Sequence, residues 1–120
     1  MSCFFLCDNQ DVWNPSNTVA RLFVSTAEEI QHEFSLPTGL SRIMDDECEV
    51  DGEVFSAFIS SLLVRYDRSN NLPLRGLLEG VISIGLVLLD RAGRPVGDLQ
   101  NLSEFWQERR DDFAQSMPRG

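Results

Sequence analysis

The chain has 120 residues, of which 42% are hydrophobic, and a net charge of −9 from 19 acidic and 10 basic side chains. This size and composition predict one globular domain, residues 1–120, with its own core. The excess of acid disfavours binding to nucleic acid or to an anionic membrane, because both require a positive surface. The negative net charge favours a basic partner, or it only keeps the protein soluble. Three cysteines without paired spacing indicate no disulfide framework, which favours a cytoplasmic protein.

The N-terminal segment is predicted to form a β-hairpin. Residues 3–7 are apolar and aromatic, and the polar residues 8–11 separate them from Val12 and Trp13. Two short apolar runs joined in this way are typical of two antiparallel strands. Pro15 is expected to end the second strand, because it has no backbone N–H to donate.

A helix is predicted next, with Asn14 as its N-cap and Pro15 in its first turn. Apolar side chains then recur at helical spacing as far as Phe34. Residues 19–24 are also compatible with a strand that precedes a shorter helix, but the unbroken apolar stripe favours one helix. Residues 36–39 are expected to end it.

A third short strand and a second helix follow. Residues 47–50 alternate acidic and apolar side chains, which favours a strand. Asp51 is predicted to cap a helix whose apolar stripe, from Val54 to Tyr66, is the cleanest in the chain. The polar residues 67–71 then form a loop.

The longest apolar segment runs from Leu74 to Leu89 and predicts a central helix. Its polar residues Arg75, Glu79 and Ser83 are spaced four apart and form one narrow stripe, so other helices should cover the remaining faces. The run of residues 81–89 within it is shorter than the roughly 20 residues that span a bilayer.

Three glycines lie within this predicted helix, and each destabilises a helix interior by up to about 1 kcal/mol relative to alanine. We expect them to allow another helix to approach closely. A phosphate site is disfavoured, because no glycine-rich turn precedes a helix in the pattern of a phosphate-binding loop. The three are Gly76, Gly80 and Gly85.

The C-terminal part is predicted to contain a loop, residues 91–98, and a weaker amphipathic helix capped by Ser103. Residues 116–120 are expected to be a frayed tail. The whole pattern predicts an α+β fold, with about four helices around the central helix and a small sheet of two or three short antiparallel strands.

The densest charge is a run of six acids that could bind a metal or a basic partner. An EF-hand loop requires acids at positions 1, 3 and 5, glycine at 6 and glutamate at 12. With Gly52 at position 6, position 12 is Phe58, so no metal site is predicted. An acidic patch that binds a partner is the functional prediction, beside that of a solvated strand edge. The acids are Asp45, Asp46, Glu47, Glu49, Asp51 and Glu53.

Two aromatic neighbourhoods are further candidates. Trp13, with Asn14 and Ser16 at the junction of strand and helix, could line a small pocket, although a tryptophan there more often covers the end of a core. Trp106 and Arg109 on the last helix could form a partner-facing anchor, because tryptophan and arginine are enriched in interface hot spots.

No catalytic residue and no cofactor are predicted, so an enzyme is the less favoured class. His32 is expected at the surface, without an orienting partner. Cys3, Cys7 and Cys48 have no adjacent basic residue that would stabilise a thiolate.

Five segments resemble those of a family of small actinobacterial proteins of unknown function. The resemblance covers residues 3–92 and implies a bacterial, cytoplasmic protein of one domain, without a known activity or catalytic residue. The segments are VWNPSN at 12–17, VARLF at 19–23, LPTGL at 36–40, DEC at 46–48 and LLEG at 77–80.

The leading functional prediction is a small acidic binding protein, in particular an immunity protein that neutralises a basic toxin through the acidic run. The alternative is an accessory protein or small enzyme of a biosynthetic pathway that holds a small molecule beside Trp13. Neither prediction includes an oligomeric state.

Overall fold

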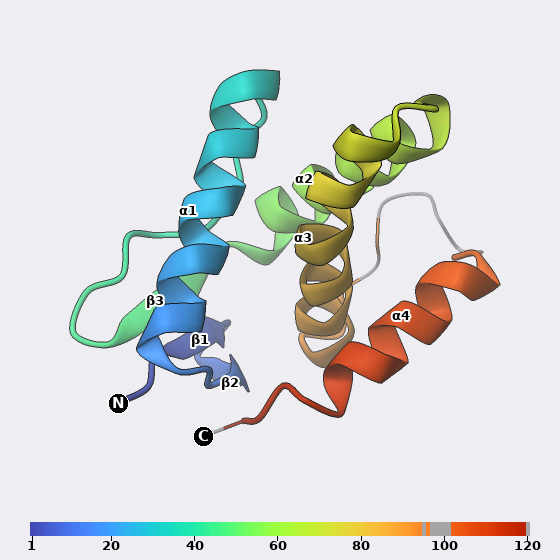
Figure 1. Cartoon of the computed structure of the whole chain (residues 1–120). Coiled ribbons are helices and arrows are strands. Elements are labelled where there is room, and N and C mark those ends of the chain that lie inside the picture. Colours follow the sequence, from blue (N-terminus) through green and yellow to red (C-terminus); the bar gives the residue numbers. More distant parts are fainter. Residues whose placement is uncertain (95, 97–101, 120) are drawn as a thin grey trace.

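The computed structural model describes residues 1–94, 96 and 102–119. It has an α+β fold of four helices and a small sheet (Figure 1). The elements are β1 (Phe4–Cys7), β2 (Gln10–Trp13), α1 (Asn17–Phe34), β3 (Glu47–Val50), α2 (Gly52–Arg68), α3 (Leu72–Arg91) and α4 (Glu104–Ala114).

The sheet has the strand order β2-β1-β3. β1 and β2 form the predicted antiparallel hairpin, whose turn residues Asp8 and Asn9 both have positive φ, as a type I′ turn requires. β3 pairs with β1 in parallel, so the prediction of a purely antiparallel sheet was wrong at this strand. The reason is the connection, because α1 crosses over the sheet between the two strands and returns the chain in the same direction.

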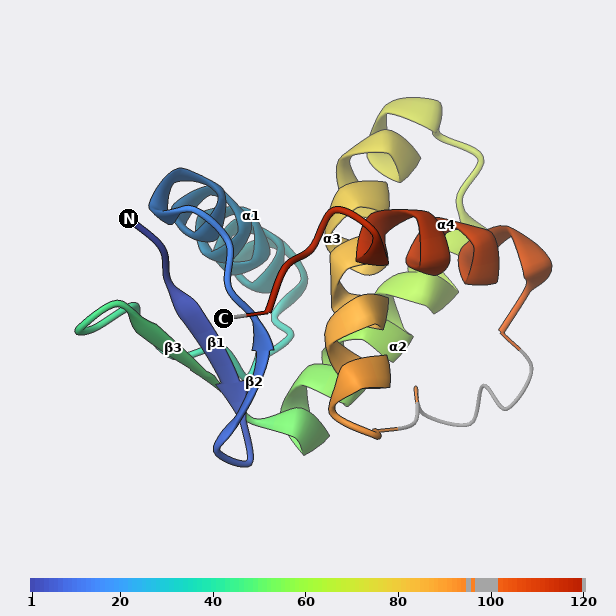
Figure 2. The ribbon, with the colours of Figure 1, turned by 90° about the horizontal axis from the view of Figure 1, so that it is seen from below.

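α1 is one continuous helix, which excludes a strand at residues 19–24. Its N-cap is Ser16, two residues later than the predicted Asn14, and the Ser16 hydroxyl accepts a hydrogen bond from the Val19 amide at 3.3 Å. Pro15 therefore lies before the helix and not in its first turn. Figure 2 shows α1 lying across the sheet.

α3 is the central helix. It packs against α2 and α4, and also contacts α1 and β2. Leu78 and Ile82, one turn apart, are both buried. Asp51 caps α2 as predicted, whereas α2 continues to Arg68 into the predicted polar loop, and Asn71 caps α3. The core therefore lies between the inner face of the sheet and the three helices that surround α3.

The three glycines of α3 have different surroundings. A Cβ atom on Gly85 would lie 2.8 Å from Cγ1 of Ile59 on α2, so this glycine allows the predicted close approach. Among the described residues no heavy atom lies within 4 Å of such a Cβ on Gly76 or Gly80, so the same prediction was wrong for them. No helix of the described chain covers that part of α3.

The C-terminal tail is held in place where the sequence predicted fraying. Met117 is buried, and the Pro118 carbonyl accepts a hydrogen bond from the Asn14 amide at 2.7 Å. The Arg91 guanidinium donates to the carbonyls of Val12 (2.9 Å) and Met117 (2.7 Å), and burial lowers the pKa of Arg91. Arg91 thus joins α3, β2 and the tail. Of the predicted loop 91–98, residues 95, 97 and 98 lie outside the described part, as does Gly120.

Candidate functional site

The acidic run spans a turn, a strand and a helix start. Asp45 and Asp46 occupy the two central positions of a tight turn with φ of 53° and 60°. Glu47 and Glu49 point away from the core on β3, because Cys48 and Val50 between them are buried. Two further acids, Asp51 and Glu53, lie at the start of α2.

The six carboxylates of this run are exposed, and within the described residues none forms an ion pair. Asp51 accepts a hydrogen bond from the Val54 amide at 3.2 Å as the helix cap. Their field extends inward, since Asp46 and Glu47 add to burial in raising the pKa of the Cys3 thiol. The run therefore presents concentrated negative charge, and within the described residues only Arg94, near Asp51, lies close enough to reduce it.

The outer face of the sheet combines this charge with apolar surface. In the β1–β3 register, Phe4 lies opposite Glu47 and Leu6 lies opposite Glu49, so these side chains share one face. Phe4 is 36% exposed and Leu6 is half-buried. Phe4 was not predicted as a surface residue, because residues 3–7 are all apolar and their pattern does not indicate which face of the strand is inward.

A polar hollow of about 660 Å³ lies beside the acidic run. Its lining includes Asp8, Ser41, Glu49, Asp51 and Arg94, and Arg94 forms an ion pair with Asp8 at 3.0 Å. Arg94 is thus already paired at this edge, which leaves Glu49 and Asp51 as available acceptors for a basic group.

Trp13, Asn14 and Ser16 do not form a common polar pocket. Trp13 is 2% exposed and packs against Phe5 and Phe23, with ring centroids 4.9 and 5.6 Å away. The Asn14 side-chain oxygen is buried and has no hydrogen-bond partner among the described residues, and Ser16 serves as the α1 cap. The indole of Trp13 nevertheless borders an apolar hollow of about 410 Å³ between the start of α1, the middle of α3 and the end of α4.

Trp106 belongs to the core. It is 4% exposed and contacts Tyr66 and Phe105, with ring centroids 5.0 and 4.9 Å away. Arg109 pairs with Glu79 at 3.1 Å, and Glu79 also accepts a hydrogen bond from the Tyr66 hydroxyl, which raises the pKa of Tyr66. These residues fasten α4 to α2 and α3, and only part of Phe105 and Arg109 reaches solvent.

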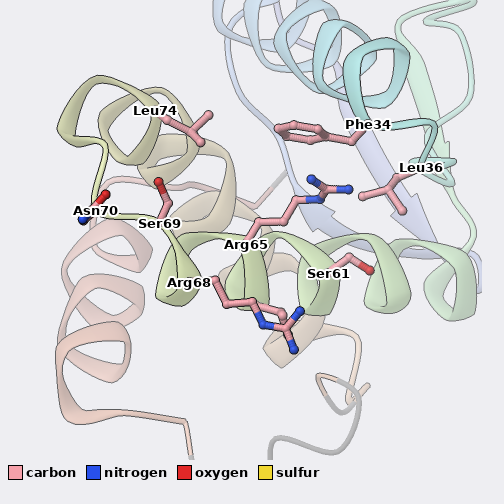
Figure 3. A pocket seen from close by; sticks show the side chains of 9 residues that line it. Phe34, Leu36, Ser61, Arg65, Arg68, Ser69, Asn70 and Leu74 are labelled. Atoms are coloured by element: carbon pink, nitrogen blue, oxygen red, sulfur yellow. The ribbon is translucent and has the colours of Figure 1, made fainter.

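The hollow shown in Figure 3 has a volume of about 720 Å³ and lies between the end of α1, the end of α2 and the start of α3. The Arg65 guanidinium lies 4.1 Å from the Phe34 ring centroid. In Figure 3 the guanidinium groups of Arg65 and Arg68 point to different sides of α2 and do not converge on one point. Both arginines suit the negative end of the α2 dipole, which accounts for their position.

An apolar groove, here called the α1/α3 groove, runs between α1 and α3. One part of the groove is a hollow with a volume of about 330 Å³, and its lining includes Val19, Leu22, Gly76, Leu77 and Gly80. Val19 and Ile84 also line the hollow beside Trp13, so the two hollows are continuous. The sequence pattern missed the groove, because Leu22 and Leu77 fit the same apolar stripes as core residues.

The remaining titratable candidates are the three cysteines and the single histidine. No group of His, Cys, Asp and Glu in the described residues could hold a metal ion. The three cysteines are free and buried, and burial raises the pKa of each thiol, which disfavours the nucleophilic thiolate. His32 is exposed, in agreement with the sequence.

A family model described as "Family of unknown function (DUF6086)" matches residues 1–119. No curated protein and no solved structure matches the chain.

Proposed function

We propose that this chain, which belongs to the DUF6086 family of unknown function, is a non-catalytic binding protein for a basic protein partner. The observation that carries the proposal is the set of six exposed carboxylates in residues 45–53, none of which forms an ion pair within the described residues. Such a surface accelerates encounter with a positive partner and rejects a negative one.

The outer face of the sheet supplies the short-range part of this interface. Phe4 lies beside Glu47 and provides an aromatic contact that a partner can desolvate, while Glu47 and Glu49 accept hydrogen bonds from arginine or lysine. The fixed turn at Asp45 and Asp46 adds two carboxylates whose position is set by the backbone. The negative charge would thus accelerate association with the partner, and the aromatic ring would slow its dissociation.

An immunity protein that neutralises a toxin is the specific form of this proposal. A basic nuclease is a suitable toxin, because carboxylates along a strand can replace the phosphates that its active surface recognises. An actinobacterial origin and a cytoplasmic location, as the resemblance implies, belong to the same proposal. Its support is the net charge of −9 and the exposure of all six carboxylates of the acidic run.

The test replaces Asp46 with Asn and Glu47 and Glu49 with Gln in one variant, and measures association with the partner recovered by pull-down or encoded beside the gene. Exposed charges attract over about 8 Å at physiological salt. We therefore expect the association rate to fall at least tenfold at low salt, with a smaller salt dependence and little change in dissociation.

A matched variant removes the same charge elsewhere, with Asp67→Asn, Glu104→Gln and Glu108→Gln, three residues that are also exposed. Its association rate should fall much less, because its charges lie away from the proposed interface. Equal effects of the two variants would show that only net charge matters. For the toxin form, co-expression of the chain should restore growth of cells that produce the partner, and failure to do so would refute that form alone.

A further inference from the structure

The α1/α3 groove is an apolar surface that the chain leaves open. Leu22 is 63% exposed and Leu77 is 72% exposed, on opposite walls of the groove. Val19, between them and the hollow beside Trp13, is 42% exposed. Figure 1 looks onto this side, with α1 and α3 next to each other and the tail crossing below. Large apolar side chains gathered along a groove are characteristic of interaction sites.

The glycines of α3 give the groove a floor without side chains. A Cβ on Gly76 or Gly80 would meet no heavy atom within 4 Å. Glycine destabilises a helix interior relative to alanine, so these two positions weaken α3 without improving the packing of this chain. Bare backbone on a helix allows a second helix to approach closely, and here that helix has to come from outside the described chain.

α3 as a whole carries more apolar surface than the fold buries. By length and composition it could cross a membrane, with a mean hydropathy of 1.8, and 50% of that stretch is buried. The floor from Gly76 to Ile84 extends about 12 Å at the rise of an α-helix. The hollow beside Trp13 extends the groove toward Phe113 and Met117. This length suits two to three turns of a helix that inserts side chains at positions i, i+3 or i+4, and i+7.

Charges around the groove are mainly acidic. Glu29 and Glu33 are exposed and lie three and seven residues beyond Thr26, on the same stripe of α1, and Asp112 lines the opposite end. Arg21 is on the other side of α1 from Val19. Arg119, close to Arg91 in the tail, adds one positive charge at that end. The rim is therefore negative overall and complements a basic helix.

We propose that the α1/α3 groove docks one amphipathic helix of another protein, with leucine-type side chains against the glycine floor and arginine or lysine at its flanks. A second copy of this chain fits less well. The groove comprises 14 residues, fewer than the roughly 20–30 a side of a standard interface. Each copy also has a net charge of −9, so two copies repel each other. The groove is separate from the acidic run, so neither proposal depends on the other.

The experiment titrates the ¹⁵N-labelled full chain with a synthetic 16-residue helical peptide that carries leucines at i, i+3, i+4 and i+7 positions and arginines on its other face. We expect saturable one-to-one binding with a Kd in the micromolar range. Amide shifts should change along residues 76–84 of α3 and residues 19–26 of α1.

The variant Gly80→Leu should weaken binding at least tenfold, because the new side chain occupies the floor, while its Tm stays equal or rises. Ala57→Leu, which places the same side chain at an exposed position of α2, should bind like the unmodified chain. Loss of binding in a well-folded Gly80→Leu protein supports the groove, and unchanged binding refutes it.

Two control peptides test the chemistry. A peptide of the same composition with scrambled order, which has no apolar stripe, should not bind, and a peptide with glutamates in place of arginines should bind at least tenfold more weakly. Equal binding of either would overturn the proposal. Shifts confined to residues 45–53 would place the peptide on the acidic run, and concentration-dependent shifts of Leu77 without peptide would identify a second copy as the occupant; either result would also overturn it.

Discussion

Cys48 is a buried thiol that the chain keeps protonated. It lies on the inner face of β3 with no exposed surface, and its Sγ donates to the Ser41 carbonyl at 3.3 Å. Burial is the largest cause that raises the pKa of Cys48 to about 11. Because the unfolded thiol ionises near pH 9, the folded state holds this proton more tightly than the unfolded state does.

The stability of the chain should therefore decrease as pH rises through this interval. The contribution of Cys48 is fully present below about pH 9 and is lost progressively toward pH 11. Urea unfolding should show about 2 kcal/mol less stability at pH 10.5 than at pH 8 from this group. The variant Cys48→Ala should have a correspondingly smaller pH dependence, and an identical slope in both proteins would contradict the assignment.

Single residues were predictable where one local contact decides the outcome. Asp51 and Ser103 cap α2 and α4 as the sequence indicates, since each is a capping residue directly before an amphipathic stripe. The α1 cap was misplaced, because Asn14 and Ser16 are equally good caps and only the Ser16–Val19 hydrogen bond separates them. The burial of Trp106 was not predictable, because its contact with Tyr66 joins residues 40 positions apart.

At the scale of the elements, α3 shows that one residue type can have opposite roles along a helix. Gly85 lies against Ile59 and Phe55, whereas Gly76 and Gly80 face open space. The sequence could show that α3 was apolar and central. It could not show which glycines meet a neighbour, because that depends on where α1 and α2 cross it.

Alanine substitutions should separate the two roles. Gly85→Ala should lower stability by about 1–3 kcal/mol, because the added methyl group overlaps Ile59 in a filled interior. Gly80→Ala should raise stability by about 0.5–1 kcal/mol, through helix propensity alone. Urea melts of the two variants give both values, and a destabilised Gly80→Ala would mean that another part of the chain covers this position.

The parallel orientation of β3 could not be predicted from the sequence, for a related reason. Alternation in residues 47–50 correctly indicated a strand, in which the structure buries Cys48 and Val50. It carries no information on direction or on the neighbouring strand, because side chains alternate in the same way in parallel and antiparallel ladders. The position of α1 over the sheet determines the direction.

At the scale of the molecule, composition and patterning led to the fold class and to a core around α3, while surface organisation remained hidden. Leu22 and Leu77 satisfy the same helical spacing as buried leucines, and only the separation of α1 from α3 exposes them. The acidic run could be located, since its charges are adjacent in sequence. The neighbouring Phe4 could not, because its pairing with Glu47 spans 43 positions.

The mixed sheet also implies an order of folding. The β1–β2 turn contains two residues, and the contacts of Phe5 with Trp13 and Phe23 join residues that are close in the sequence. Pairing of β3 with β1 has to close a loop of about 40 residues, at greater entropic cost. The hairpin and α1 should therefore form the nucleus, and β3 should join after the rate-limiting barrier.

Folding kinetics measured by stopped flow would show this order. Val12→Ala, within the hairpin, should slow folding with a φ-value of about 0.5 or more, whereas Val50→Ala on β3 should mainly accelerate unfolding, with a φ-value below about 0.3. Both valines are buried, so each truncation is large enough to measure. The reverse pattern would mean that the long crossover closes first and that the short turn only completes the sheet.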